Sequence, residues 1–122
     1  MTFHVELPMP PSANALFFNR AGKGRVKTTT YRDWRKNAVL AIYAQVRADR
    51  RVAGAVSVHI ALPFKCRLDV DNTIKPILDA LVGSNRIDDD ANVREVTASK
   101  QHDLKIAVVT VSERPWPKAV AA

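Results

Sequence analysis

The chain has 122 residues, 47% of them hydrophobic and 25% charged, which is typical of a globular protein with one core and predicts a single domain spanning 1–122. Its 19 Lys and Arg residues against 12 Asp and Glu give a formal net charge of +7. That charge implies an acidic partner, with nucleic acid favoured over an anionic membrane surface. The single cysteine, Cys66, excludes an internal disulfide and argues against a Cys-based zinc site. No apolar run approaches the roughly 20 residues of a membrane helix and no signal-peptide pattern opens the chain, so we expect a cytoplasmic protein with no membrane role.

In the first half of the chain, residues 2–7 alternate in polarity and predict a strand, which three prolines end. Residues 12–14 have the composition of an ordered turn, and residues 19–27 that of an exposed loop or hairpin tip. Thr29 or Thr30 can cap a long helix running to about Asp49. Its apolar stripe at helical spacing consists of Trp34, Ala38, Ala41, Ile42 and Val46.

In the second half, residues 56–61 alternate as a strand does, and residues 72–82 predict a short helix. Pro76 is tolerated only in a first helical turn, so this helix should begin at Asn72 or Thr73. Residues 93–100 and 104–111 predict two more strands, the second apolar enough to be central, and residues 112–122 a loosely ordered tail. The predicted buried face of the short helix consists of Ile74, Ile77, Leu78 and Leu81. The predicted fold is therefore α/β of mixed α+β type: a small mixed β-sheet packed with one long and one short helix.

The acids are distributed unevenly. Six of the twelve lie between positions 69 and 90, where only Lys75 and Arg86 offset them. Hard divalent cations bind carboxylate oxygens, and a phosphate backbone binds Lys and Arg. An acidic segment in a basic chain therefore suggests a metal held against a polyanion. The six acids are Asp69, Asp71, Asp79, Asp88, Asp89 and Asp90.

Asp69 and Asp71 are two residues apart, so in an extended chain their carboxylates would point to the same side and could reach one cation. Lys75, four residues on, would face the same cavity and could contact a scissile phosphate or position a water. A carboxylate from residues 88–90 would complete the shell of a Mg²⁺ ion. Each feature taken singly has a structural explanation: a helix cap at Asp71, a solvated turn at 88–90, and a weak surface pair between Lys75 and Asp79. Their coincidence in a basic chain favours the metal.

The acidic segment differs from three known acidic or phosphate-binding motifs. An EF-hand counted from Asp69 fails, because Ile74 and Ala80 occupy the positions that require Gly and Glu, and no P-loop occurs. Residues 69–73 mimic the Asp-x-Asp-x-Thr motif of haloacid dehalogenase phosphatases, but polar residues precede them, mid-chain in a small protein. Beside a metal held against a polyanion, two other functions therefore stay open: a small phosphatase-like hydrolase, and a non-catalytic nucleic-acid-binding module whose acids serve as caps and turns.

Basic residues gather upstream of the acidic segment, in the glycine-containing loop and along the exposed part of the long helix. Together they predict a surface that follows a DNA backbone. The predicted DNA-binding residues are Arg20, Lys23, Arg25, Lys27, Arg32, Arg35 and Lys36.

Three segments, in order and at suitable spacing, resemble the RusA family of Holliday junction resolvases, the crossover junction endodeoxyribonucleases. The segments are Leu7-Pro8-Met9-Pro10-Pro11-Ser12-Ala13-Asn14, Asp69-Val70-Asp71-Asn72-Thr73-Ile74-Lys75 continuing into Leu78-Asp79-Ala80-Leu81, and Asp89-Asp90-Ala91-Asn92-Val93. The central motif is the most specific, and the resemblance spans essentially the whole chain.

The resemblance implies a small homodimeric Mg²⁺-dependent endonuclease, of a kind often encoded by prophages, without an organic cofactor. Such enzymes bind four-way junction DNA and nick two strands symmetrically in recombination and repair, and Mn²⁺ could substitute for Mg²⁺. The family's metal-binding carboxylates fall on Asp69, Asp71 and Asp90, and its essential lysine on Lys75. The extra acid Asp88 leaves Asp89 as the alternative third ligand. A two-fold dimer would match a two-fold substrate.

Overall fold

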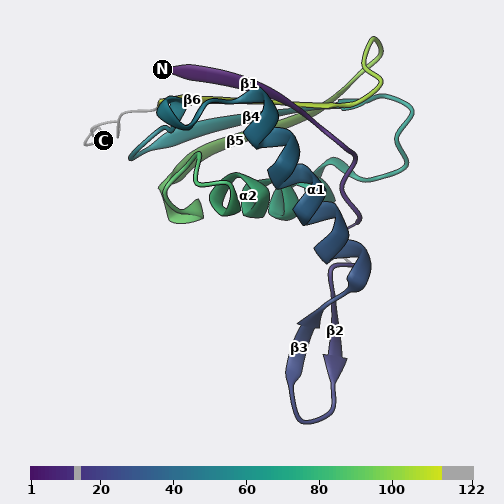
Figure 1. Ribbon diagram of the computed structural model, residues 1–122. Helices are drawn as coiled ribbons and strands as arrows, with labels where there is room; N and C mark the ends of the chain where they lie inside the picture. The colour runs from purple at the N-terminus through teal and green to yellow at the C-terminus, as the bar shows by residue number, and fades with distance from the viewer. Residues whose placement is uncertain (13–14, 114–122) are drawn as a thin grey trace, which may run out of the picture.

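The body of the molecule is a four-stranded sheet with two helices. The computed structural model describes residues 1–12 and 15–113 (Figure 1). The strand order is β1 (Thr2–Leu7), β6 (Ala107–Glu113), β4 (Val56–Pro63) and β5 (Val93–Gln101). β6 is antiparallel to both β1 and β4, whereas β4 and β5 are parallel. The sheet is mixed, as the sequence predicts, and the last strand is indeed central.

The helices α1 (Thr29–Gln45) and α2 (Ile74–Gly83) lie on the same side of the sheet (Figure 1). The register explains why that side is apolar: Val5 and Ile60 both face Val109, and all three are buried. The residues next to them, such as His4 and Thr110, fall on the opposite face, where their side chains hydrogen-bond at 2.8 Å. One apolar face packed under two helices is the layer architecture expected of an α+β protein, so the predicted fold class is confirmed.

α2 connects the two parallel strands, since parallel neighbours need a crossover rather than a hairpin. The chain leaves β4, turns through a 3₁₀ helix, η3 (Val70–Thr73), and enters α2. It then returns through another, η4 (Asp90–Asn92), into β5. The whole acidic segment therefore lies in this crossover, on both sides of α2.

α1 carries most of the apolar stripe that its sequence predicts: Trp34, Ala38 and Ile42 are buried in the core, and Ala41 is partly buried against it. Val46 is buried too, but just beyond the end of the helix. The boundaries of α1 differ from the prediction. The N-cap is Thr28, whose hydroxyl accepts from the backbone N–H of Tyr31, not Thr29 or Thr30.

The C-terminal end of α1 also differs, because the helix ends at Gln45 rather than near Asp49. Val46 is extended there, and its carbonyl accepts two hydrogen bonds, at 3.2 and 2.9 Å, from the guanidinium of Arg86. A short 3₁₀ helix, η2 (Ala48–Arg50), follows.

A two-stranded hairpin, β2 (Phe17–Arg20) and β3 (Gly24–Lys27), projects from the body just before α1 (Figure 1). Gly22 and Gly24 have φ of 76° and 70° at its tip, a conformation that glycine adopts without strain. The sequence predicted either an exposed loop or a hairpin tip for this segment, and the structure shows a hairpin.

Other boundaries are also corrected. α2 begins at Ile74 with Pro76 still in its first turn, and η3 occupies the preceding residues. The last strand starts at Ala107 and continues through Ser112 and Glu113, so those two residues do not belong to a tail. The predicted turn at 12–14 lies partly, and the rest of the predicted tail wholly, outside the described residues. Among the described helices, none has the length and apolar character needed to cross a membrane.

Candidate active site

Asp69 and Asp71 lie where the chain turns from β4 toward α2. Asp69 is extended, but the residues after it enter η3, closed by the Asn72 N–H donating to the Asp69 carbonyl at 3.1 Å. The expectation that both acids share one extended stretch is therefore wrong: the backbone between them turns.

Neither of these carboxylates acts as a helix cap. Asp69 precedes η3 without a side-chain cap bond, and α2 is preceded by Thr73, also without one. Within the described residues, no hydrogen bond or ion pair engages the side chain of Asp69 or Asp71. The capping explanation for Asp71 thus fails, and both carboxylates are available to a ligand.

Lys75 is the second residue of α2 and pairs with Asp79, Nζ to Oδ2, at 3.8 Å. The same Asp79 oxygen accepts a short hydrogen bond from the Tyr31 hydroxyl of α1. Burial, and then the hydrogen bond and charge of Asp79, raise the pKa of the Tyr31 phenol far above its usual range. Tyr31 therefore stays protonated, and it fixes the carboxylate that pairs with Lys75.

Phe17 joins the hairpin to this lysine. The Lys75 Nζ lies 5.9 Å from the centre of the Phe17 ring, and the Arg25 guanidinium lies 4.2 Å from it. The ring also meets that of Tyr31 edge to face, with centroids 5.8 Å apart. The base of the basic hairpin is thus in direct contact with the side chains around Lys75.

Asp88 is occupied elsewhere. Its carboxylate forms a short ion pair with Arg51 and accepts from the Gly54 N–H at 3.2 Å. These contacts tie the start of the α2–β5 connection to the loop before β4, so Asp88 has a structural explanation that Asp69 and Asp71 lack.

Asp89 and Asp90 share a hydrogen bond and differ in their titration. Asp89 caps η4 by accepting from the Ala91 N–H at 3.1 Å, and that bond is the main reason its pKa is lowered. The hydrogen bond with Asp89 is the main reason the pKa of Asp90 is raised, and the charges of Asp89 and Asp79 add to it. The charge of Asp79, on α2, therefore acts on Asp90 across the crossover.

The described residues do not form a ready-made metal shell, since no three His, Cys, Asp or Glu side chains among them are close enough together to hold an ion. The donor chemistry nevertheless suits a hard cation, because Asp69 and Asp71 are uncommitted oxygen donors and Asp90 experiences repulsion from neighbouring acids.

A protein-family model matches most of the chain. Residues 8–112 match the model for endodeoxyribonuclease RusA. The chain belongs to the RusA family. No curated protein matches the chain. RusA proteins are endodeoxyribonucleases, so membership implies Holliday junction endonuclease activity and confirms the resemblance carried by the sequence motifs.

The predicted DNA-binding residues of this RusA protein fall on two elements. Arg20 and Arg25 lie on the hairpin strands and Lys23 at the tip, all exposed, with Lys27 half-buried at the base. Arg32, Arg35 and Lys36 lie on the first turns of α1. The hairpin and this part of α1 are consecutive in the chain, and they flank Lys75 through Phe17 and Tyr31.

The contacts of two residues in and around the site could not be predicted from the sequence. Tyr31 lies 48 positions from its partner Asp79, so no local pattern links them; its place one turn before Trp34 on the apolar stripe is the only signal. From the sequence, Arg86 is expected to offset the charge of the neighbouring acids. In the structure it is buried and donates to the carbonyls of Val46 and Ser84 instead.

Proposed function

We propose that this RusA protein is a Mg²⁺-dependent, structure-selective endonuclease that resolves Holliday junctions by paired symmetric nicks during DNA recombination and repair. The observation that carries the proposal is the state of Asp69 and Asp71. These two carboxylates have no hydrogen bond or ion pair with any residue the structure describes, and they lie in the family's central motif near a lysine and a basic hairpin.

Asp69, Asp71 and Asp90 would hold the metal. Asp90 is preferred to Asp89 because Asp89 is occupied as the cap of η4, and Asp88 is excluded by its pairing with Arg51. A bound Mg²⁺, or Mn²⁺ in its place, would supply Lewis-acid polarisation of a phosphoryl oxygen and acidify a water.

Lys75 would bind the scissile phosphate or orient the attacking water. Its side chain is about half exposed, and Asp79 holds its ammonium beside the first turns of α2. Tyr31 and Asp79 position this cation rather than react. Positioning of this kind lowers the barrier because the charge is in place before the phosphate arrives.

The seven basic residues of the hairpin and of α1 would hold the junction arms through their phosphates. We further propose that the protein acts as a homodimer, because each chain carries one set of these residues and resolution needs two related cuts. Its DNA substrate and its single free cysteine fit action in the cytoplasm.

The direct test uses the purified protein with a labelled four-way junction and a linear duplex of the same arm sequence, each with Mg²⁺ or with EDTA. We expect nicks in the junction only, and only with Mg²⁺. Tight junction binding without cleavage in Mg²⁺ or Mn²⁺ would refute the enzyme and leave a DNA-binding module. Equal cleavage of duplex and junction would refute the structure selectivity.

A further inference from the structure

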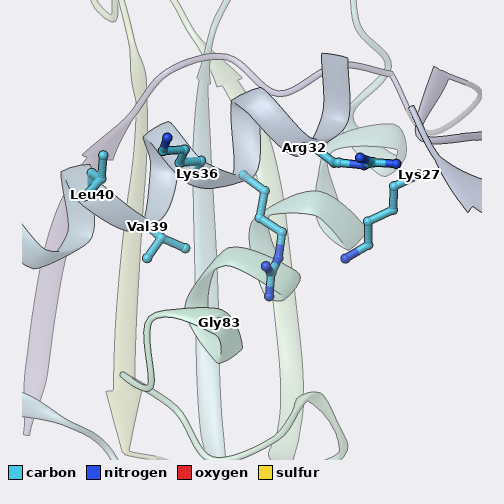
Figure 2. Close-up of a pocket in the computed structure, with 7 residues that line it drawn as sticks. Lys27, Arg32, Lys36, Val39, Leu40 and Gly83 are labelled. Carbon is cyan, nitrogen blue, oxygen red and sulfur yellow. The ribbon is translucent and has the colours of Figure 1, made fainter. Parts of the chain in front are cut away.

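A second feature of the structure lies away from Asp69, Asp71 and Lys75. A cavity of about 320 Å³ opens between the first half of α1 and the end of α2 (Figure 2). In Figure 2, Lys27 and Arg32 lie together at one end of it, and Val39 and Leu40 form an apolar wall on α1. We call it the basic pocket; its lining residues are Lys27, Arg32, Arg35, Lys36, Val39, Leu40 and Gly83.

The charges of the basic pocket are uncompensated. Four of its seven lining residues are cationic and none is acidic. None of the four cations takes part in an ion pair with another described residue, and the enclosed Nε of Arg35 has no hydrogen-bond partner among them. Like charges gathered in one concave site repel one another, and a bound anion relieves that repulsion.

Gly83 brings Arg35 close to α2. A Cβ built at this position would lie 2.5 Å from an Nη of Arg35, so the guanidinium fits there only because the residue is glycine. The carbonyls of Ala80, Leu81 and Val82 already accept backbone N–H groups of the following turn. These carbonyls at the end of α2 therefore do not neutralise the cations of the pocket.

The basic pocket and Lys75 lie toward opposite ends of α2. Lys75 is in its first turn and Gly83 at its end, about 12 Å apart at roughly 1.5 Å of rise per residue. An anion in the pocket would be several nucleotide steps from the one at Lys75, since each strand of B-DNA advances about 3.4 Å per nucleotide.

We propose that the basic pocket is a second phosphate-binding site, which takes a backbone phosphodiester of a DNA arm at a distance from the cut. The cations complement the phosphate, and the wall formed by Val39 and Leu40 fits the apolar edge of a deoxyribose. This inference rests on the proposed function, because it requires DNA as the ligand.

The test measures junction binding by fluorescence anisotropy in EDTA across a range of salt concentrations. The variant Arg32→Gln/Lys36→Gln removes two exposed charges of the pocket. The matched control, Arg47→Gln/Arg50→Gln, removes two exposed charges beyond the other end of α1. Losing one phosphate contact lowers the slope of log K against log[salt] by about 0.7 to 0.9. We expect a decrease of that size for the pocket variant and a native slope for the control.

Gly83→Ala provides a second variant that keeps every charge. The added methyl must displace the Arg35 guanidinium, so we expect weaker junction binding at a native oligomeric state in sedimentation. A native slope in the pocket variant, or an equal loss in both double variants, overturns the proposal. A pocket variant that changes the oligomeric state instead overturns it too, because a second copy of the chain would then occupy the pocket. Cleavage by the unmutated protein in Mg²⁺, measured alongside, separates failure of the pocket from failure of the proposed function.

Discussion

The aspartates of the acidic segment differ in what surrounds their carboxylates. Asp88 is neutralised by Arg51, and Asp79 is held by Lys75 and Tyr31. Asp69 and Asp71 have no such partner within the described residues. Asp79 and Asp88 thus have a structural role in the fold, and we propose that Asp69 and Asp71 bind the ligand. The run of acids alone does not suggest this division.

The Asp89–Asp90 pair can be tested by titration. In metal-free protein we expect Asp90 to titrate above an ordinary aspartate and Asp89 below one, for the reasons of hydrogen bonding given above. Asp89→Asn removes the neighbouring charge and carboxylate, and it should move the pKa of Asp90 down toward its usual value. Carboxyl-carbon NMR over acid pH measures both. An unchanged Asp90 titration in the variant would contradict the coupling.

Tyr31 can be tested through stability. Tyr31→Phe keeps the buried ring and deletes the hydroxyl that donates to Asp79, so we expect a loss of about 1.5 to 3 kcal/mol in the free energy of unfolding, as for a hydrogen bond to a charged group. The matched control is Tyr43→Phe, the same change at an exposed tyrosine of the same helix, which should stay within about 0.5 kcal/mol. Urea denaturation of the two variants measures these changes in the free energy of unfolding. Equal stabilities would show that Asp79 does not depend on Tyr31.

At the scale of elements, the connection between hairpin and α1 is the structural link that brings the basic residues to the site. Thr28 carries it. Its hydroxyl accepts from the Tyr31 N–H at 3.1 Å and donates to the Ala15 carbonyl at 2.7 Å, while its own N–H donates to Leu16. One residue thus caps α1 and closes the base of the hairpin.

Thr28→Ala should therefore cost about 1 to 2 kcal/mol in unfolding free energy, the range measured for lost N-caps. Thr29→Ala and Thr30→Ala change exposed residues inside the helix, where alanine is the better helix former, and should cost little. Thermal unfolding of the three variants distinguishes them. A larger loss at Thr29 or Thr30 than at Thr28 would restore the boundary that the sequence alone predicts.

The elements also show what sequence can predict. The stripe from Trp34 to Val46 is a local periodicity, and it places α1 and its buried face correctly. The end of α1 depends on Arg86, 40 positions away, and so could not be predicted. The turn between Asp69 and Asp71 is likewise invisible to an alternation argument, because η3 begins within the motif itself. The acidic motif points to Asp69 and Asp71 as candidates, but it does not predict the turn between them.

At the scale of the whole molecule, a chain with net charge +7 keeps half its acids in one crossover, flanked by a basic hairpin and a basic helix. This arrangement suits an enzyme that attracts a polyanion over a broad surface and presents oxygen ligands at one point. Because the attraction is screened by salt, junction affinity should depend strongly on ionic strength, whereas the chemistry should depend on the few uncommitted carboxylates.

The most direct measurement compares junction cleavage rates of Asp71→Asn and Asp88→Asn in Mg²⁺, with junction affinity measured in parallel. Both variants exchange one aspartate of the same segment for its amide. We predict that Asp71→Asn abolishes cleavage and leaves binding intact, while Asp88→Asn, which alters only a structural pair, still cuts. Cleavage by Asp71→Asn at the native rate, or loss of binding together with cleavage, would contradict the assignment of the uncommitted carboxylates to the metal.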